Sequence, residues 1–256
     1  MSILDEAVDI QDLGQSNLWV LYGKSGSGKT KILGTFPKPM LYLQMGDDGS
    51  NTIANVDGVK AIRLDAKKEG NPKEEVDPVK RLKEVSKELL RDKYYASVAV
   101  DTFSLLVSEW TNGKVTSKGK KMTQQLWGDL KNDQEEIIKL MHKLARKRIV
   151  ILTCHESTDS IEGMEDEIAP DVRPSVSKGA RTYLEGMANY GIHTTKIIKE
   201  VTKGGSTKEV VKFAADIGPN PYYWTKLQID PSIKVPKRII NPSYDKFMEI
   251  INSGEE

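Results

Sequence analysis

The 256-residue sequence contains one cysteine, Cys154, and no long hydrophobic run. A single cysteine excludes an internal disulfide and any cysteine-based zinc or iron–sulfur cluster. No stretch reaches the roughly 18–20 consecutive apolar residues that a transmembrane helix needs, so we expect no membrane partner. The first residues, MSILDEAVDIQDLG, are acidic and lack the apolar core of a signal peptide, which predicts a cytoplasmic protein.

An excess of charge of one sign is also missing. The sequence has 38 Lys and Arg residues against 37 Asp and Glu residues, a formal net charge of +1. This balance excludes nucleic-acid binding through a uniformly positive surface, so any such binding must depend on local patches. With 38% hydrophobic and 29% charged residues, the composition is that of a globular protein with enough residues to bury a large core.

Short apolar runs alternate with segments of helical periodicity along most of the chain. This alternation predicts an α/β fold with a mostly parallel sheet covered by helices on both faces. The apolar runs that we interpret as strands are residues 18–22, 40–43, 60–64, 97–100, 149–153 and 223–230, and the helical segments include 79–90, 104–110, 122–147, 176–188 and 243–252.

The pattern changes after residue 190. Two alternating segments, 190–201 and 208–214, flank Lys203-Gly204-Gly205-Ser206, which predicts a C-terminal β-hairpin that extends the sheet. We therefore expect an N-terminal segment over residues 1–16, one core domain over 17–230, and a tail with a terminal helix over 231–256.

Residues 23–30 match the P-loop pattern G-x-x-x-x-G-K-[ST] completely, between an apolar strand and a helix. In such a loop, glycines allow backbone N–H groups to point at a phosphate without interference from Cβ atoms. We expect Lys29 to neutralise the β- and γ-phosphates and Thr30 to hold Mg²⁺, so ATP and Mg²⁺ are the predicted ligands. The predicted nucleotide-binding residues are Gly23, Lys24, Ser25, Gly26, Ser27, Gly28, Lys29 and Thr30.

Polar residues follow three of the expected strands, at the edge where an open parallel sheet binds its ligands. Asp101 follows SVAV and is predicted to hold Mg²⁺ with Thr30, although an Asp there also suits a helix cap. His155 follows the strand 149–153 and could contact the γ-phosphate or simply be a satisfied polar group. Asp47 and Asp48 are candidates for positioning the attacking water, with an ordinary Asp-Asp-Gly turn as the alternative.

The order of these motifs resembles the RecA-like core. The P-loop is followed by PMLYLQ with the acidic turn GDDG, by SVAVDT and by ILTCHE. The sequence is similar to phage-encoded AAA-type nucleotide-binding proteins that carry an FPKP signature, here residues 36–39. Some members of that group look like single-strand annealing recombinases. The resemblance, over residues 18–240, implies ATP hydrolysis in phage DNA recombination or repair, in the host cytoplasm.

The resemblance also implies roles for individual residues and for partners. The family's catalytic carboxylate falls at Asp47 or Asp48, where relatives usually have Glu, so the shorter side chain implies slow turnover. His155 falls at the γ-phosphate sensor. Lys237 and Arg238 are similar to a late basic element that completes the site of an adjacent subunit in a ring or filament; a basic surface turn is the alternative. The expected partners are single-stranded DNA, further copies of the chain and a single-strand binding protein.

RecA-like proteins contact DNA through two loops, and the two corresponding segments here differ in charge. The first, 111–121, is interpreted as a loop and contains no acid, whereas the second, 156–175, has seven acids and no Lys or Arg over residues 156–171. The first suits phosphate contacts, although a solvated loop is the alternative, and the second does not suit them. The predicted DNA-binding residues are Lys114, Lys118, Lys120 and Lys121.

Two other functions compete with the recombinase hypothesis. One is a nucleotide-switched protein-binding module with little turnover and no DNA binding, favoured by the acidic segment 156–171 and by Asp in place of Glu. The other is a small-molecule kinase, which the lack of an Arg-rich lid segment disfavours.

Overall fold

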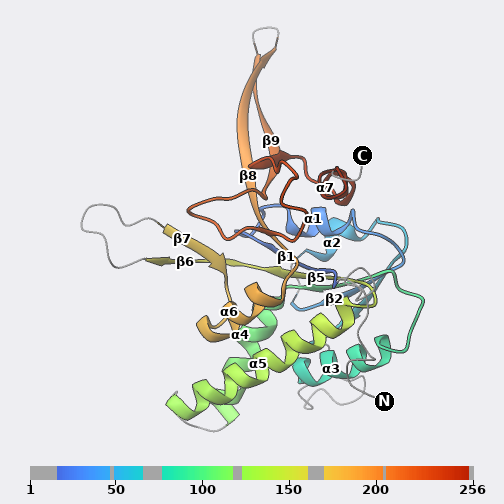
Figure 1. Ribbon diagram of the computed structural model, residues 1–256, viewed down its shortest axis with the longest axis vertical. Coiled ribbons are helices and arrows are strands. Elements are labelled where there is room, and N and C mark those ends of the chain that lie inside the picture. Colours follow the sequence, from blue (N-terminus) through green and yellow to red (C-terminus); the bar gives the residue numbers. More distant parts are fainter. Residues whose placement is uncertain are drawn as a thin grey trace.

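The computed structural model describes residues 16–46, 49–65, 77–117, 123–160, 170–203 and 206–253. Within them, one nine-stranded sheet has the order β11-β9-β8-β1-β5-β4-β2-β3, with β10 beside β8 (Figure 1). Its strands are β1 Leu18–Tyr22, β2 Met40–Gln44, β3 Val59–Arg63, β4 Ser97–Asp101, β5 Ile149–Cys154, β8 Tyr190–Lys203, β9 Ser206–Asp216, β10 Lys226–Leu227 and β11 Arg238–Ile240.

The neighbours from β3 to β8 are all parallel, which brings the carboxyl ends of six strands to one edge. In register, Gln44 lies opposite Asp101, and Tyr22 lies opposite Cys154. Strands β1, β4 and β5 are buried along their whole length, as expected of strands covered on both faces. The prediction of an α/β fold with a mostly parallel, helix-flanked sheet is confirmed.

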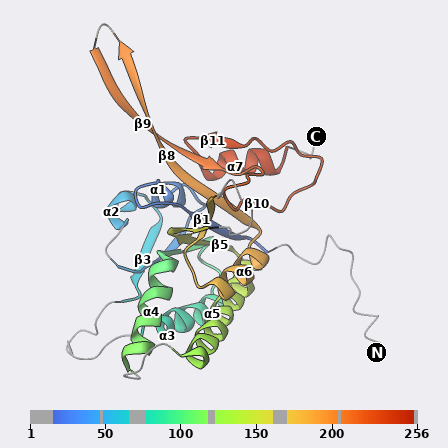
Figure 2. The ribbon, with the colours of Figure 1, turned by 90° about the vertical axis from the view of Figure 1, so that its left-hand side faces the viewer.

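Two hydrophobic cores lie on the two faces of the sheet, and consecutive residues of β1 contribute to opposite cores. Leu18 and Val20 pack with α3–α6, whereas Trp19 and Leu21 pack with α1, α2 and α7 (Figures 1 and 2). This alternation follows from the period of two along a strand. The helices are α1 Lys29–Leu33, α2 Ser50–Ile53, α3 Pro78–Leu89, α4 Phe103–Ser117, α5 Gln124–Ala145, α6 Lys178–Met187 and α7 Tyr244–Ile251.

Three sequence interpretations need correction. The expected loop over 111–121 is wrong as far as residue 117, because α4 continues through Gly113, and one glycine costs a helix only about 1 kcal/mol. The segment 156–171 is not simply a loop, since β6 (Glu156–Ser160) pairs antiparallel with β7 (Pro170–Pro174) in a separate sheet. The strand expected over 223–230 is reduced to the two residues of β10.

Strands β8 and β9 form a long antiparallel pair, from His193 opposite Asp216 to Lys203 opposite Ser206. At its base the pair is tied to β1, β10 and β11, and beyond it the two strands project from the body of the molecule (Figures 1 and 2). Among the described residues, no helix is both long and apolar enough to cross a membrane.

Candidate nucleotide-binding site

The loop between β1 and α1 adopts a conformation that only glycine allows at two of its positions. Gly28 has φ 96°, and a Cβ atom there would lie 2.5 Å from Cδ1 of Phe213. At Gly23, a Cβ atom would lie 2.3 Å from the carbonyl oxygen of Thr194. The glycines of the P-loop motif therefore permit both the turn and its close contact with β8 and β9.

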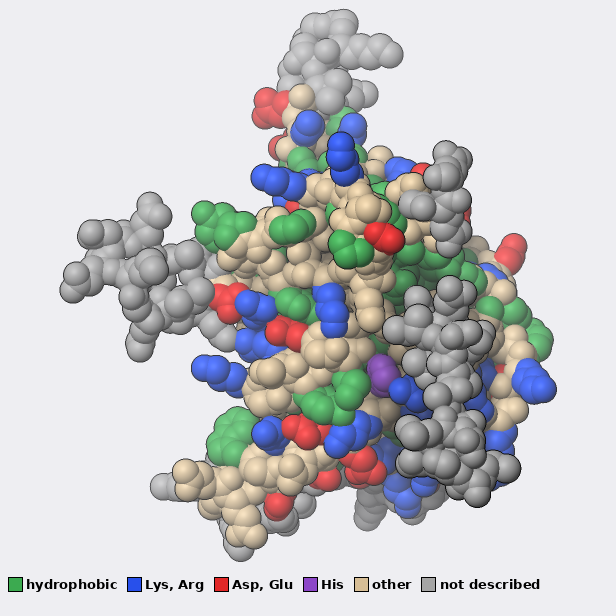
Figure 3. Space-filling view, in the orientation of Figure 1, with side chains coloured by type: hydrophobic (Ala, Val, Ile, Leu, Met, Phe, Trp, Pro, Cys, Tyr) green, Lys and Arg blue, Asp and Glu red, His purple; other side chains and the backbone are tan. Residues whose placement is uncertain are grey.

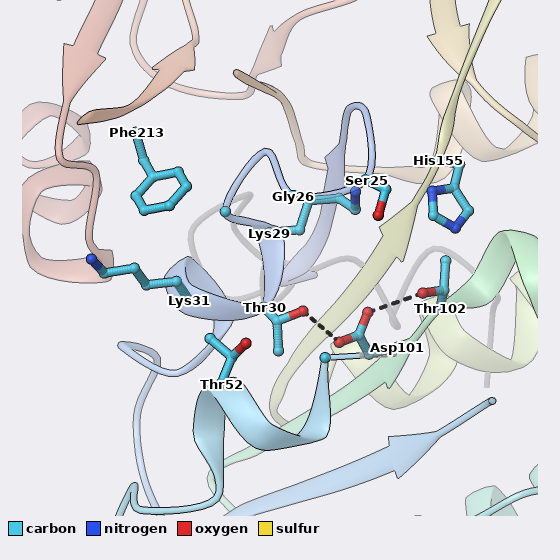
Figure 4. Close-up of a pocket in the computed structure, with 12 residues that line it drawn as sticks. Ser25, Gly26, Lys29, Thr30, Lys31, Thr52, Asp101, Thr102, His155 and Phe213 are labelled. Atoms are coloured by element: carbon cyan, nitrogen blue, oxygen red, sulfur yellow. Dashed lines mark hydrogen bonds between the residues drawn. The ribbon is translucent and has the colours of Figure 1, made fainter. Parts of the chain in front are cut away.

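A pocket of about 280 Å³ opens beside this loop (Figure 4). Asp101, Thr102 and His155 lie on one side of the P-loop, and Lys31 and Phe213 lie on the other. The pocket thus joins side chains from α1, β4, the end of β5 and β9 at the carboxyl edge of the sheet. Its lining residues are Ser25, Gly26, Gly28, Lys29, Thr30, Lys31, Gly49, Thr52, Asp101, Thr102, His155 and Phe213.

The loop is held by hydrogen bonds from inside and from β8. The buried Lys29 ammonium donates to the carbonyl oxygens of Gly23 and Lys24, both at 2.9 Å. The hydroxyls of Ser27 and Thr194 lie 2.6 Å apart, and Thr194 also donates to the carbonyl oxygen of Tyr22 at 3.1 Å. These bonds fix the lysine within the loop and attach the loop to the base of β8.

Asp101 is only 2% exposed, and its carboxylate accepts hydrogen bonds from four hydroxyl groups. Oδ2 accepts from Thr30 at 2.9 Å and from Tyr42 at 2.8 Å. Oδ1 accepts from Thr153 and, at 3.3 Å, from Thr102. A buried carboxylate needs compensation for its lost hydration, and these neutral donors supply hydrogen bonds without supplying a positive charge.

The space beside Thr30 and Asp101 fits a small cation. Gly49, with φ 88°, borders it, and a Cβ atom there would lie 2.7 Å from Thr30 Oγ1 and 3.1 Å from Asp101 Oδ2. A hydroxyl and a carboxylate are hard oxygen ligands of the kind that Mg²⁺ prefers in combination with substrate phosphates. The donor chemistry and the space kept clear by Gly49 therefore fit Mg²⁺.

His155 follows β5 directly and lines the same pocket. Its backbone N–H donates to Ser104 Oγ at 3.0 Å, and its carbonyl oxygen accepts from the N–H of Ser175. Cys154, just before it, is fully buried, and burial raises the pKa of its thiol to about 12. The thiol is therefore protonated at neutral pH, as expected of a small buried apolar residue rather than a nucleophile.

Comparison with known proteins agrees with this geometry. A family model described as an AAA domain matches residues 16–219, most of the chain. The chain belongs to the AAA-domain family. It is a P-loop nucleotide-binding protein of the AAA type, a class that typically binds its nucleotide together with Mg²⁺. No curated protein matches the sequence.

Several residues that the sequence predicted to be functional lie outside the described residues or outside the pocket. Asp47 and Asp48 are not described, although Gly49, which follows them, borders the site. Lys114 lies within α4, and Lys118, Lys120 and Lys121 are outside the described residues. Their expected roles remain predictions.

Lys237 and Arg238 do not line the nucleotide pocket of their own chain. Lys237 is exposed, whereas Arg238 binds Asp216 through two hydrogen bonds, Nε to Oδ1 at 2.7 Å and Nη2 to Oδ2 at 3.0 Å. Asp216 also lies 3.1 Å from His193 Nδ1, and His193 Nε2 lies 3.0 Å from Glu156. The AAA domain thus contains a cluster of ionisable side chains, Glu156–His193–Asp216–Arg238, in which His193 and Asp216 are buried and Arg238 is exposed; we call it the Asp216 cluster.

The Asp216 cluster favours the ionised carboxylate. Burial raises the pKa of Asp216, but the hydrogen bonds and positive charge supplied by His193 and Arg238 outweigh burial and hold that pKa below its usual value. The ring of Tyr223 stacks on His193, with centroids 3.9 Å apart and planes at 9°. The cluster fastens the base of β8 and β9 to β11 and to the start of β6.

Sequence reasoning missed the residues that support Asp101 and one wall of the pocket. Tyr42 and Thr153 reach Asp101 because β2 and β5 are the two neighbours of β4, a strand order that the sequence does not reveal. Phe213 lies on β9, far along the chain from the P-loop that it contacts. The one available signal was that Tyr42 and Thr153 are polar residues within otherwise apolar runs.

Proposed function

We propose that this AAA domain hydrolyses ATP with Mg²⁺. The observation that carries the proposal is the 2.9 Å hydrogen bond between Thr30, at the end of the P-loop, and Asp101, at the end of β4, within one pocket. Mg²⁺ bound to ATP would neutralise charge on the β- and γ-phosphates. Thr30 and Asp101 would hold the ion, and the P-loop N–H groups would bind the phosphate oxygens.

The other residues of the pocket have two proposed roles, which are binding the phosphates and acting on the γ-phosphate or the attacking water. Lys29, held by two loop carbonyls, would exchange those hydrogen bonds for bonds to phosphate oxygens. His155, on the Asp101 side of the P-loop, would contact the γ-phosphate or the attacking water. Asp47 or Asp48 would position that water, and with aspartate in this role we expect slow turnover.

The test replaces Lys29 by Ala and measures MgATP binding by calorimetry and phosphate release by a coupled assay. We expect loss of measurable turnover and at least about tenfold weaker binding, since a charge-assisted contact contributes roughly 1.5–3 kcal/mol. Lys87→Ala, an exposed change on α3, is the matched control and should behave like the wild type. Normal ATP binding by the Lys29 variant would refute the assignment of the site.

We propose further that the ATPase acts in phage DNA recombination or repair, by binding or annealing single-stranded DNA as a ring or filament. The resemblance of its motif order to the RecA-like core supports this, and so does the separation of its basic and acidic segments. The test is phosphate release with and without single-stranded DNA at several protein concentrations. Stimulation by DNA that increases with protein concentration is expected, and Lys237→Ala should reduce it.

One observation favours the alternative of a nucleotide-switched protein-binding module. Strand β6 begins at Glu156, immediately after His155 of the nucleotide pocket, and leads into an acidic segment that suits a protein partner better than DNA. Nucleotide-dependent ordering of a segment is a known form of switch. ATP binding without DNA binding at low salt would select this alternative.

A further inference from the structure

The projecting part of the β8–β9 pair, residues 195–203 and 206–213, is called the arm here. At its base, β8 pairs with β1 up to His193, and β9 pairs with β11 from Ala214. Within the described residues, the arm strands form ladder pairs only with each other, and at the base the Phe213 carbonyl oxygen also accepts a hydrogen bond from the N–H of Asn241 at 2.7 Å. A two-stranded ribbon that contributes to neither hydrophobic core is marginal by itself, so its length points to a binding role.

The pairing register sorts the arm side chains onto two different faces. In an antiparallel pair, residues directly opposite each other lie on the same face, and the faces alternate along each strand. One face has Ile197 opposite Lys212 and Lys199 opposite Val210, and we call it the lysine face. The other has Lys196 opposite Phe213, Ile198 opposite Val211 and Glu200 opposite Glu209. Both described acids of the arm are therefore on the second face.

The two faces also differ in their relation to the nucleotide pocket. Phe213, on the second face, lines that pocket and has the Lys31 ammonium 4.9 Å from its ring centroid. The lysine face is turned the other way, so its charges do not serve the nucleotide of the same chain. Lys199 is exposed and Lys212 is half-buried, and neither forms an ion pair with a described residue. Lys and Arg side chains gather near the base of the arm (Figure 3).

The lysines recur regularly. On the lysine face, successive residue pairs each carry one lysine, first on β9 and then on β8, about 7 Å apart along the ribbon. In the sequence alone, further lysines stand four residues after Lys199 and four residues before Lys212, at positions 203 and 208. Among the described side chains of this face, positive charges spaced along the ribbon, each opposite an aliphatic residue and without acids, match a polymer of regularly spaced negative charges.

We infer that the lysine face of the arm binds the sugar–phosphate backbone of nucleic acid. This inference rests on the proposed action on DNA and assigns the contact to a surface separate from the segment 111–121. Lysines at this spacing contact phosphates without reading bases, so the binding is independent of sequence and sensitive to salt.

The experiment measures the fluorescence anisotropy of a labelled single-stranded oligonucleotide between about 50 and 200 mM salt. The double variant Lys199→Gln/Lys212→Gln is expected to bind about tenfold more weakly than the wild type. Its plot of log affinity against log salt should be shallower by about 1.4, because each phosphate contact to a single strand contributes about 0.7. The same measurement on a labelled duplex shows whether the lysine face binds both double-stranded and single-stranded nucleic acid or single strands alone. Weaker binding of the lysine variant to either oligonucleotide supports the inference.

The matched control is Glu200→Gln/Glu209→Gln, which removes two charges from the other face and should not weaken binding. MgATP binding and thermal unfolding of both double variants should match the wild type, because neither pair lines the nucleotide pocket or belongs to a hydrophobic core.

Three outcomes would overturn the inference. If the wild type binds neither oligonucleotide at low salt, the proposed action on DNA fails with it. If the wild type binds and the lysine variant has the same affinity and salt dependence, only the arm assignment fails. If the lysine variant changes oligomeric state in light scattering while its DNA affinity is unchanged, the lysine face contacts an acidic surface of another copy instead.

Discussion

Two buried carboxylates flank the P-loop region, and they are satisfied in opposite ways. Asp101 is 2% exposed and accepts hydrogen bonds from four hydroxyls, whereas Asp216 is 3% exposed and binds the Arg238 guanidinium and the His193 ring. Asp101 lines the nucleotide pocket, and Asp216 does not. Burial alone therefore does not distinguish a functional carboxylate from a structural one.

The difference lies in where the compensating charge comes from. Arg238 brings a full positive charge to Asp216 from the same chain, so that carboxylate has its counter-ion after folding. Hydroxyl donors orient the Asp101 carboxylate but leave its negative charge in place, which suits a group that must receive a cation with the substrate. The comparison predicts that substitutions at Asp101 change activity and that substitutions at Asp216 change stability.

The largest effect is expected from Asp101→Asn. Asparagine keeps the shape but removes the negative charge that would hold Mg²⁺, so turnover should fall about 100-fold or more. Thermal stability should change less than turnover, because the amide oxygen can still accept from one pair of hydroxyls and the amide N–H groups can donate to the oxygens of the other pair. Steady-state phosphate release at several Mg²⁺ concentrations, with parallel melting curves, checks this. Unchanged turnover would remove Asp101 from the metal site.

Asp216→Asn is expected to do the reverse. It removes the counter-ion of Arg238 and a partner of His193, and should lower the free energy of unfolding by about 2 kcal/mol. Turnover per folded molecule should remain near that of the wild type. Urea unfolding and phosphate release on the same samples separate the two effects. A large loss of turnover with normal stability would place Asp216 in the catalytic machinery and erase the contrast.

Tyr42→Phe tests whether the hydroxyl donors orient the Asp101 carboxylate. The variant removes one hydroxyl, which donates to Oδ2 at 2.8 Å, and leaves the ring in its core. Because a hydrogen bond contributes about 1 kcal/mol, turnover should fall about fivefold, with a higher Mg²⁺ requirement. Tyr95→Phe, on a half-buried tyrosine whose hydroxyl does not contact Asp101, is the control. Equal Mg²⁺ titrations of both variants would show that Tyr42 does not orient the carboxylate.

The smallest effect concerns pH. Because the pKa of Asp216 is lowered by folding, its ion pair stabilises the native state above the unfolded pKa of about 3.9, and this contribution disappears as pH falls through the native pKa. Arg238→Met should therefore cost about 1 kcal/mol near neutral pH and progressively less below about pH 4. Urea unfolding at several pH values measures the difference, and a constant difference would contradict this account.

The sequence was most informative where function is carried by consecutive residues. The P-loop, Asp101 and His155 each follow an apolar run directly, and parallel strands must bring such positions to one edge. Tyr42, Thr153 and the partners of Asp216 were not predictable, since they depend on which strands are neighbours. The extension of α4 was missed because the lysine-containing segment 111–121 was interpreted as a loop, although packing around the preceding Trp110 sustains the helix.

The hydrogen bonds from Thr194 to Ser27 and Tyr22 connect the P-loop to the base of the arm, so a small rotation at the base would be enlarged along the length of the arm. Thr194 is one hydrogen bond away from the P-loop. The outer end of β8 at Lys203 is nine residues, or roughly 30 Å, from Thr194. A rotation of the arm by about 5° about Thr194 would move that outer end by roughly 3 Å. A rearrangement of the P-loop too small to disturb the core would thus be amplified into a displacement large enough to make or break a contact at the far end.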